Sequence, residues 1–131
     1  MQNATLEHVN VTVSNPVATA QRLCDLFGWH IRWQGKALND GTTVHVGTDE
    51  SYIAVYGQGV PSVPAEVSYS VRGGLNHIGI VVDDLDAAER RVKDAGYEPH
   101  SHADYEPGRR FYYRDEDNIE FEVISYALVP A

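Results

Sequence analysis

Two histidines, His8 and His77, lie in nearly the same sequence setting in the two halves of the chain. The first stands in LEHVNVTV and the second in LNHIGIVV, so each is followed by alternating Val, Ile or small residues. A neutral imidazole can serve as an acid, a base or a metal ligand. A lone histidine in a strand is more often a hydrogen-bonded structural residue, so it is the repetition that makes these two residues candidates for a site.

The element that holds the first histidine is predicted to be a strand over residues 5–13. Val9, Val11 and Val13 alternate with His8, Asn10 and Thr12, which gives the strand one apolar and one polar face. A helix should follow the SNP sequence, with Ser14 or Asn15 as N-cap, Pro16 in the first turn and Gly28 at the end. Three shorter strands are predicted near residues 29–34, 42–48 and 51–56.

The second half of the chain repeats this order. A strand over LNHIGIVV precedes a helix that is capped by Asp83 or Asp84 and closed by Gly96. Strands are predicted near residues 97–103, 109–114 and 119–126. From the helix ends onward the repeat offset is taken as 68, which pairs 27–29 with 95–97, 44–45 with 112–113 and 53–55 with 121–123. The sequence therefore predicts two βαβββ modules, 5–57 and 74–126, in one domain, 1–131, with a connector at 58–73.

Length and charge limit the functions that this domain can have. The chain has 131 residues, of which 43% are apolar, and this is enough to build a buried core. The formal net charge of −9 disfavours nucleic acid and anionic membranes as partners. No apolar run has the length of a membrane span, and a single cysteine, Cys24, fits a reducing compartment, so a cytoplasmic location is expected. Cys24 has the spacing of a buried helix face.

The duplicated βαβββ order, the histidine in each first strand and the ending FYYRDEDNIEFEVISY resemble the vicinal oxygen chelate superfamily. This superfamily includes glyoxalase I, fosfomycin-resistance proteins, bleomycin-resistance proteins and extradiol dioxygenases. The resemblance covers about residues 6–126. It implies an α+β fold in which the two modules form an open, cup-shaped mixed β-sheet around a metal. By the same match, the metal ligands are His8, His77 and Glu122.

The residue types support that ligand set. Two neutral imidazoles and one carboxylate leave a divalent ion such as Fe, Mn, Zn or Ni with a net positive charge and open positions. Glu120 and Glu122 point to the same side of the predicted last strand, so both are candidates for the carboxylate. The repeat offset and the family signature favour Glu122, with Glu120 at the rim. His100 and His102, in HSH, should share one strand face, and a surface role is the preferred interpretation for both.

One position departs from the family pattern. Proteins that resemble glyoxalase I have a fourth ligand, a carboxylate, on the last strand of the first module, where this chain has Ala54 in YIAVY. Alanine neither binds metal nor moves a proton. A glutathione-dependent isomerase is therefore a weaker hypothesis for this chain. Three ligands suit extradiol dioxygenases and fosfomycin-resistance enzymes better.

Further site residues are expected around the ligands. His45 is the best candidate for an acid–base group, and Tyr112 or Tyr113 could donate a hydrogen bond to a bound oxyanion. Arg109 and Arg110, after a Pro-Gly turn, are candidate anion ligands. The predicted substrate contacts are Ala54, Tyr56 and Arg110. Aromatic residues that could line a binding pocket are Trp29, Trp33, Tyr52, Tyr56, Tyr69 and Tyr105.

The preferred function is a divalent-metal-dependent enzyme that acts on a small substrate through two of its oxygens, with dioxygenase-like or with lyase- or isomerase-like chemistry. The alternative is a small-molecule binding protein of the bleomycin-resistance type, without catalysis. A homodimer is expected, because each module has open sheet edges and related proteins of this length usually dimerise.

Overall fold

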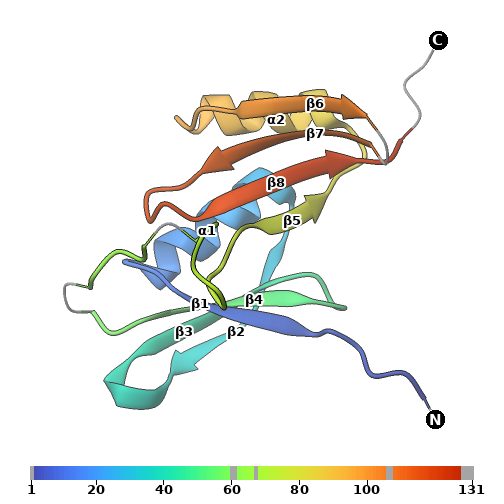
Figure 1. The fold of residues 1–131 in the computed structure, drawn as a ribbon. Coiled ribbons are helices and arrows are strands. Elements are labelled where there is room, and N and C mark those ends of the chain that lie inside the picture. The colour runs from blue at the N-terminus through green and yellow to red at the C-terminus, as the bar shows by residue number, and fades with distance from the viewer. Residues whose placement is uncertain (1, 60–61, 67, 106–107, 128–131) are drawn as a thin grey trace. The chain divides into compact units, whose positions relative to one another are not determined.

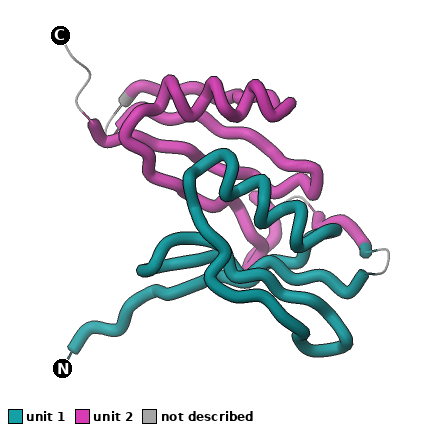
Figure 2. Tube along the Cα trace, turned by 180° about the vertical axis from the view of Figure 1, so that it is seen from behind, with its two compact units in different colours: residues 1–62 teal, residues 63–131 magenta. Residues whose placement is uncertain are grey.

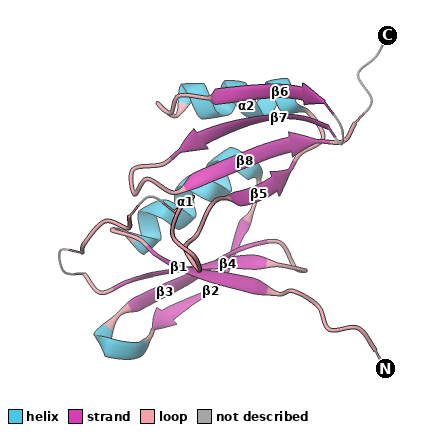
Figure 3. Cartoon of the chain, in the orientation of Figure 1, coloured by secondary structure: helices cyan, strands magenta, loops and turns pink. Residues whose placement is uncertain are grey.

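The computed structural model describes residues 2–59, 62–66, 68–105 and 108–127 (Figure 1). The chain divides into two compact units, Met1–Ser62 and Val63–Ala131 (Figure 2). The boundary lies inside the predicted connector, 58–73. Each unit contains one α-helix and four strands in the order βαβββ (Figure 3), so the predicted α+β fold with two tandem modules is confirmed.

Unit 1 is a four-stranded mixed sheet with one helix on it. In chain order its elements are β1 (His8–Thr12), α1 (Pro16–Phe27), β2 (His30–Lys36), the short 3₁₀ helix η1 (Leu38–Asp40), β3 (Thr42–Gly47) and β4 (Tyr52–Gly57). The strands lie in the order β1-β4-β3-β2. The β1–β4 pair is parallel and the other two pairs are antiparallel.

The ends of α1 form where the sequence places them. The Asn15 side chain accepts a hydrogen bond from the Ala18 N–H at 3.1 Å, Pro16 occupies the first helical position, and Gly28 ends the helix with a φ of +70°. Proline has no N–H to lose at this position, and glycine tolerates the left-handed cap. Both ends of α1 are therefore determined by local residues.

The core of unit 1 lies between α1 and one face of the sheet. Val44 and Val46 of β3 lie opposite Val55 and Ile53 of β4 in the register, and all four are buried. Buried residues of α1 that complete this layer are Ala20, Leu23 and Leu26. Because strand residues alternate between faces, the other face of the sheet carries His45, Ala54 and their neighbours.

Unit 2 has the same arrangement. Its elements are β5 (Ile78–Val81), α2 (Leu85–Asp94), β6 (His100–Tyr105), β7 (Gly108–Arg114) and β8 (Glu120–Ser125), with the strand order β5-β8-β7-β6. Asp84 caps α2 by accepting a hydrogen bond from the Ala87 N–H at 3.0 Å. The core packs Phe111, Tyr113, Phe121 and Val123 of the sheet against α2, where Leu85, Ala88 and Val92 are buried.

The two modules differ by one residue in the turn between their last two strands. Gly47 pairs with Tyr52 across turn 48–51, whereas Arg114 pairs with Glu120 across the longer turn 115–119. The repeat offset is therefore 68 in the last strand but 67 in the strand before it. The predicted match of His45 with Tyr113 is wrong, because the register places Tyr112 at the position of His45.

The longer turn is held by a partly buried aspartate. Oδ1 of Asp115 accepts hydrogen bonds from the N–H groups of Asp117 and Ile119, at 2.9 and 3.0 Å. Burial raises the pKa of Asp115 to about 6, even though the two N–H donors favour its ionised form.

Several predicted boundaries differ from the structure. The first strand of module two starts at Ile78, so His77 directly precedes β5 and does not lie inside it. β6 starts three residues later than expected, at His100. Val9, predicted to lie on a buried face, is 41% exposed, and Val13 is the buried end of that face.

Candidate functional site

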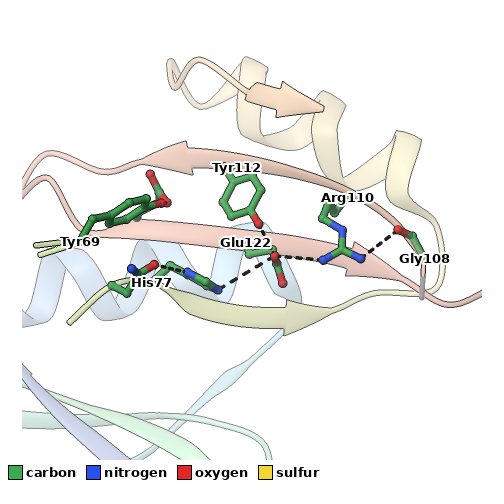
Figure 4. A network of polar contacts seen from close by, with 8 residues as sticks. Tyr69, His77, Gly108, Arg110, Tyr112 and Glu122 are labelled. Atoms are coloured by element: carbon green, nitrogen blue, oxygen red, sulfur yellow. Dashed lines mark hydrogen bonds and ion pairs between the residues drawn. The ribbon is translucent and has the colours of Figure 1, made fainter. Parts of the chain in front are cut away.

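Glu122 is the centre of a polar cluster on the open face of the unit 2 sheet (Figure 4). It lies in β8 directly opposite Tyr112 of β7, whose hydroxyl donates a hydrogen bond to Glu122 Oε2. Arg110 Nη1 lies 3.4 Å from the same oxygen, and Nη2 donates to the Gly108 carbonyl at 3.3 Å. The Glu122 side chain is 13% exposed, so this carboxylate is largely shielded from solvent.

His77 approaches the same carboxylate from the start of β5. Its Nε2 lies 4.0 Å from Glu122 Oε2, and its Nδ1 contacts Asn76 Oδ1 at 2.6 Å. The parallel pairing of β5 with β8 places Gly79 opposite Glu122, which leaves room beside the carboxylate because glycine has no side chain. The structure thus brings together two of the three predicted ligands, His77 and Glu122.

The other candidate carboxylate, Glu120, is engaged elsewhere. Arg114 Nη2 lies 2.7 Å from Oε2 of Glu120, and the Tyr69 hydroxyl donates a hydrogen bond to Oε1. Glu120 is the first residue of β8, nearer the strand's start than Glu122 as expected, and it is only 4% exposed. With both oxygens paired, Glu120 is a poorer ligand candidate than Glu122.

The open face of unit 1 carries a row of rings that crosses all four strands. His8 of β1 stacks on Tyr52 of β4 with centroids 4.8 Å apart, and Tyr52 stacks on His45 of β3 at 4.6 Å. Trp33 of β2 lies 5.2 Å from His45, at a tilt of 55°. The Arg32 guanidinium lies over the Tyr52 ring, 4.4 Å from its centroid. The third predicted ligand, His8, thus stands at one end of an aromatic row.

His45 sits within this row and is partly buried. Desolvation lowers the pKa of His45, and the nearby His8 and Arg32 lower it further. The lowered pKa favours the neutral form of the ring, in which one nitrogen has a lone pair. This is the state that an acid–base residue needs when it accepts a proton.

Tyr112 and Tyr113 lie on opposite faces of their sheet. Tyr112 contacts Glu122, and this hydrogen bond together with desolvation raises its pKa to about 12, so the hydroxyl keeps its proton. Tyr113 is 1% exposed and stacks on Phe121 in the core beneath α2, where burial raises its pKa above the usual range. We therefore leave Tyr113 out of the candidate site.

The three predicted substrate contacts lie in three different surroundings. Arg110 belongs to the Glu122 cluster. Ala54 is buried on the open face of unit 1, opposite His45 and Asn10, and matches Glu122 in register. The Tyr56 hydroxyl donates to the Leu38 carbonyl at 2.7 Å and ties η1 to the sheet, which is a structural contact.

Arg109, His100 and His102 all belong to unit 2, but their side chains do not lie on one face of its sheet. Arg109 Nη2 lies 3.1 Å from Asp86 of α2. His100 stacks on Tyr112, whereas His102 contacts Glu89 of α2 at 2.5 Å. The expectation that the two histidines share one face is wrong, because a β-bulge with Ser101 at a φ of +55° lies between them.

The remaining aromatic candidates lie at scattered places. Trp29 packs against Phe27 at the end of α1, with ring centroids 5.6 Å apart. Tyr69 reaches Glu120 from the predicted connector, a contact that no sequence signal indicated. The side chain of Tyr105 lies outside the described residues.

The chemistry of the unit 2 cluster fits a divalent metal. Two donors can share an ion when each is about 2.1 Å from it, which limits their separation to roughly 4.2 Å. The separation of His77 Nε2 and Glu122 Oε2, 4.0 Å, falls within this limit. Within the described part of either unit, no three His, Cys, Asp or Glu side chains form a metal-binding group.

A protein-family model matches most of the chain. The model of the Glyoxalase/Bleomycin resistance protein/Dioxygenase superfamily matches residues 5–123. The chain belongs to this superfamily. No curated protein matches the sequence. Over the described residues, no helix has both the length and the apolar character needed to span a membrane.

Solved structures with the same fold are distant in sequence. A glyoxylase/bleomycin resistance protein/dioxygenase domain from Frankia sp. EAN1pec has a TM-score of 0.78 at 21% identity, covering 95% of this chain and 98% of that one. The fosfomycin resistance protein FosX from Listeria monocytogenes, solved with Mn(II) and sulfate ion, has a TM-score of 0.73 at 21% identity, with coverages of 97% and 96%. FosX from Mesorhizobium loti has a TM-score of 0.72 at 21% identity, with coverages of 98% and 95%.

Proposed function

We propose that this protein is a divalent-metal-dependent enzyme that acts on a small substrate presenting two oxygens to the metal. The proposed ligands are His77 and Glu122 of unit 2 and His8 of unit 1. The observation that carries the proposal is the 4.0 Å approach of His77 Nε2 to Glu122 Oε2 on the open face of the sheet. A half-buried imidazole beside a shielded carboxylate is a natural pair of metal donors.

The donor set determines what a metal could do here. Two neutral nitrogens and one carboxylate leave positive charge on a divalent ion and positions for substrate oxygens. The metal would supply Lewis-acid polarisation of those oxygens. The fourth-ligand position holds Ala54, which leaves more room for a bidentate substrate than a carboxylate would. This supports dioxygenase-like or lyase- or isomerase-like chemistry over a glutathione-dependent isomerase.

Three residues of the chain are suited to handle the substrate itself. Tyr112 keeps its hydroxyl proton and directs it to Glu122 Oε2, and Arg110 adds a fixed positive charge beside the same carboxylate. A fixed positive charge at the site favours a substrate with an anionic oxygen. The lowered pKa of His45 favours its neutral form, which can accept a proton. These roles suggest that the substrate is a small oxyanion that loses or relocates a proton during the reaction.

The proposal is tested by metal binding to the purified, metal-stripped protein. Mn(II) is the first probe, because the Listeria FosX structure contains it, and Fe(II), Zn(II) and Ni(II) follow. His8→Ala, His77→Ala and Glu122→Gln should each remove most Mn(II) binding in calorimetry. His30→Ala and Glu116→Gln are matched controls at exposed positions and should leave it unchanged. Full Mn(II) affinity in the His77→Ala and Glu122→Gln proteins would overturn the proposal.

A second candidate function is the capture of a small molecule without catalysis. It is supported by the row of rings in unit 1, of which Trp33 is 52% exposed. Exposed rings give stacking contacts to a planar ligand. Tight binding of a planar ligand in the presence of a chelator, weakened by Trp33→Leu, would favour this function. A ligand that binds only in the presence of metal would favour the enzyme. The proposed compartment for either function is the cytoplasm, on the ground of the single Cys24.

A further inference from the structure

His8 and His77 share a feature of local structure besides their matching positions. In each case Nδ1 contacts a side-chain oxygen of the residue directly before it. Glu7 Oε1 lies 2.8 Å from Nδ1 of His8, and Asn76 Oδ1 lies 2.6 Å from Nδ1 of His77. Carboxylate and amide oxygens only accept hydrogen bonds, so Nδ1 is the donor in both pairs. The lone pair of each ring is then on Nε2.

This contact between neighbours depends on where the strands begin. Successive residues inside a strand point to opposite faces and cannot meet. Glu7 and Asn76 lie just outside the strands, because β1 begins at His8 and β5 begins at Ile78. β1 and β5 also end the strand order in their sheets, so these side chains can turn alongside the histidines at the sheet edge.

Other histidines of the chain are held differently. His30 and His102 contact Asp49 and Glu89 through Nε2, at 3.2 and 2.5 Å. His100 uses Nδ1, but its partner, Ser101, follows it in the chain. The arrangement in which the preceding residue holds Nδ1 occurs, among the described residues, at His8 and His77. An exposed side-chain contact of this kind stabilises a fold little, so stability does not explain the pattern.

We propose that Glu7 and Asn76 are positioning residues that fix the tautomer and orientation of the two histidines, so that Nε2 of each is presented to a metal. This inference rests on the proposed function. In unit 2 the geometry agrees with it, because Nε2 is the atom of His77 that lies 4.0 Å from Glu122 Oε2. A hydrogen bond from the second ring nitrogen to a fixed acceptor orients a metal-binding histidine and makes it a stronger donor.

The two positioning residues differ in charge, and this predicts different strengths. Glu7 is a carboxylate, and the Tyr52 hydroxyl donates to the same Oε1 at 3.3 Å. The Glu7 carbonyl accepts from the Tyr52 N–H at 3.0 Å, which ties its backbone to β4. Asn76 is neutral. Hydrogen bonds to charged groups are about twice as strong as those between neutral groups, so the loss of Glu7 should affect its histidine more than the loss of Asn76.

The tautomers can be measured in the metal-free protein, independently of any activity. Nitrogen-15 NMR at about pH 8.5, well above the ordinary histidine pKa of about 6.5, distinguishes a protonated Nδ1 from a protonated Nε2. We expect His8 and His77 to carry the proton on Nδ1. Glu7→Leu and Asn76→Leu should each shift the neighbouring ring toward the Nε2-protonated form. Glu7→Gln and Asn76→Asp keep an acceptor and should keep the tautomer. Asp49→Leu is the control and should change His30 alone.

Mn(II) affinity then links the tautomer to function. Glu7→Leu and Asn76→Leu should weaken binding by about 10- to 100-fold, and the two conservative variants should recover most of it. Wild-type rings protonated on Nε2 would overturn the inference whatever the metal does. Unchanged affinity in both Leu variants would also overturn it, provided that His8→Ala and His77→Ala lose binding. If those two Ala variants bind Mn(II) normally, the proposed function itself fails, and the positioning role fails with it.

Discussion

Tyr112 and Glu122 face each other across the β7–β8 ladder, and the tyrosine hydroxyl donates its hydrogen bond to Oε2 of the carboxylate. The same oxygen is the one that His77 approaches. The hydrogen bond from Tyr112 therefore helps to orient the Glu122 carboxylate, the candidate ligand. Because its pKa is raised to about 12, Tyr112 remains a donor over the whole physiological range.

Removal of the Tyr112 hydroxyl should destabilise the folded protein. Tyr112→Phe leaves a shielded carboxylate with one donor fewer, and the free energy of unfolding should fall by about 1 to 3 kcal/mol. Urea denaturation of the metal-free protein measures this. Tyr97→Phe is the matched control, because Tyr97 donates to the exposed Glu116 at 2.5 Å, where water can replace the lost bond. Equal losses in the two variants would mean that Glu122 is not specially dependent on Tyr112.

The register equivalence of Ala54 and Glu122 gives a second prediction. Ala54 lies opposite Asn10 and His45, as Glu122 lies opposite Gly79 and Tyr112. Ala54→Glu should therefore add a fourth ligand, a second carboxylate, to the proposed site and tighten Mn(II) binding by at least about tenfold relative to Ala54→Gln, which has the same size without the charge. Both variants should unfold about 1 to 3 kcal/mol more easily, because Ala54 is buried and the larger side chains overpack the site.

Activity in the Ala54→Glu protein should fall, because the added ligand takes a position that a bidentate substrate needs. Calorimetry with Mn(II) and unfolding in urea separate the two effects. Identical Mn(II) affinity in the Glu and Gln variants would show that position 54 does not face the metal, and that the equivalence of the last strands does not extend to the site.

Asp115 gives a prediction on pH. Its folded pKa, about 6, lies above the ordinary value of 3.8, so the folded state holds this proton more tightly than the unfolded chain does. The stabilising contribution is therefore present below about pH 4 and is lost as the pH rises through about 6. Asp115→Asn keeps the Oδ1 acceptor and removes the charge. It should be about 1 to 2 kcal/mol more stable than the wild type at pH 7, allowing for partial exposure, and no more stable at pH 4.

Urea unfolding at the two pH values tests this, with Asp94→Asn at an exposed position as the control for net charge. A stability difference that stays the same at pH 4 and pH 7 would contradict the assignment of the raised pKa to Asp115.

The parts of this structure that the sequence predicts are those that depend on local chemistry. The helix α1 begins and ends at Asn15 and Gly28 because a cap and a left-handed residue act on their nearest neighbours. The βαβββ order of elements in each unit follows from the internal repeat, since two copies of one pattern fold alike. The ligand candidates follow from the resemblance to the superfamily. Alternation along β8 also places Glu120 and Glu122 on one face.

The features that the sequence could not predict depend on single inserted residues or on contacts between residues far apart in the chain. One extra residue in turn 115–119 exchanges the faces of Tyr112 and Tyr113 relative to a constant offset. A bulge at Ser101 separates His100 from His102, although serine rarely adopts a positive φ. The contact between Tyr69 and Glu120 joins residues 51 positions apart, and no pattern in either segment predicts it.

The last prediction concerns assembly. β1 and β5 end the strand order of their sheets, so each unit offers an edge whose N–H and C=O groups can pair with another strand. We expect a homodimer in light scattering at micromolar concentration, and a purely monomeric protein would refute it.

If two chains exchange modules, His8 of one chain shares a metal with His77 and Glu122 of the other. A mixture of His8→Ala and Glu122→Ala proteins, unfolded and refolded together, should then regain up to about half of the sites in each heterodimer, because one of its two sites has all three ligands. If each site is built within one chain, every site in the mixture lacks a ligand and Mn(II) binding stays at the level of the separate variants. The measurement therefore distinguishes the two ways of completing the site, while the wild-type protein taken through the same refolding shows how much binding the procedure itself preserves.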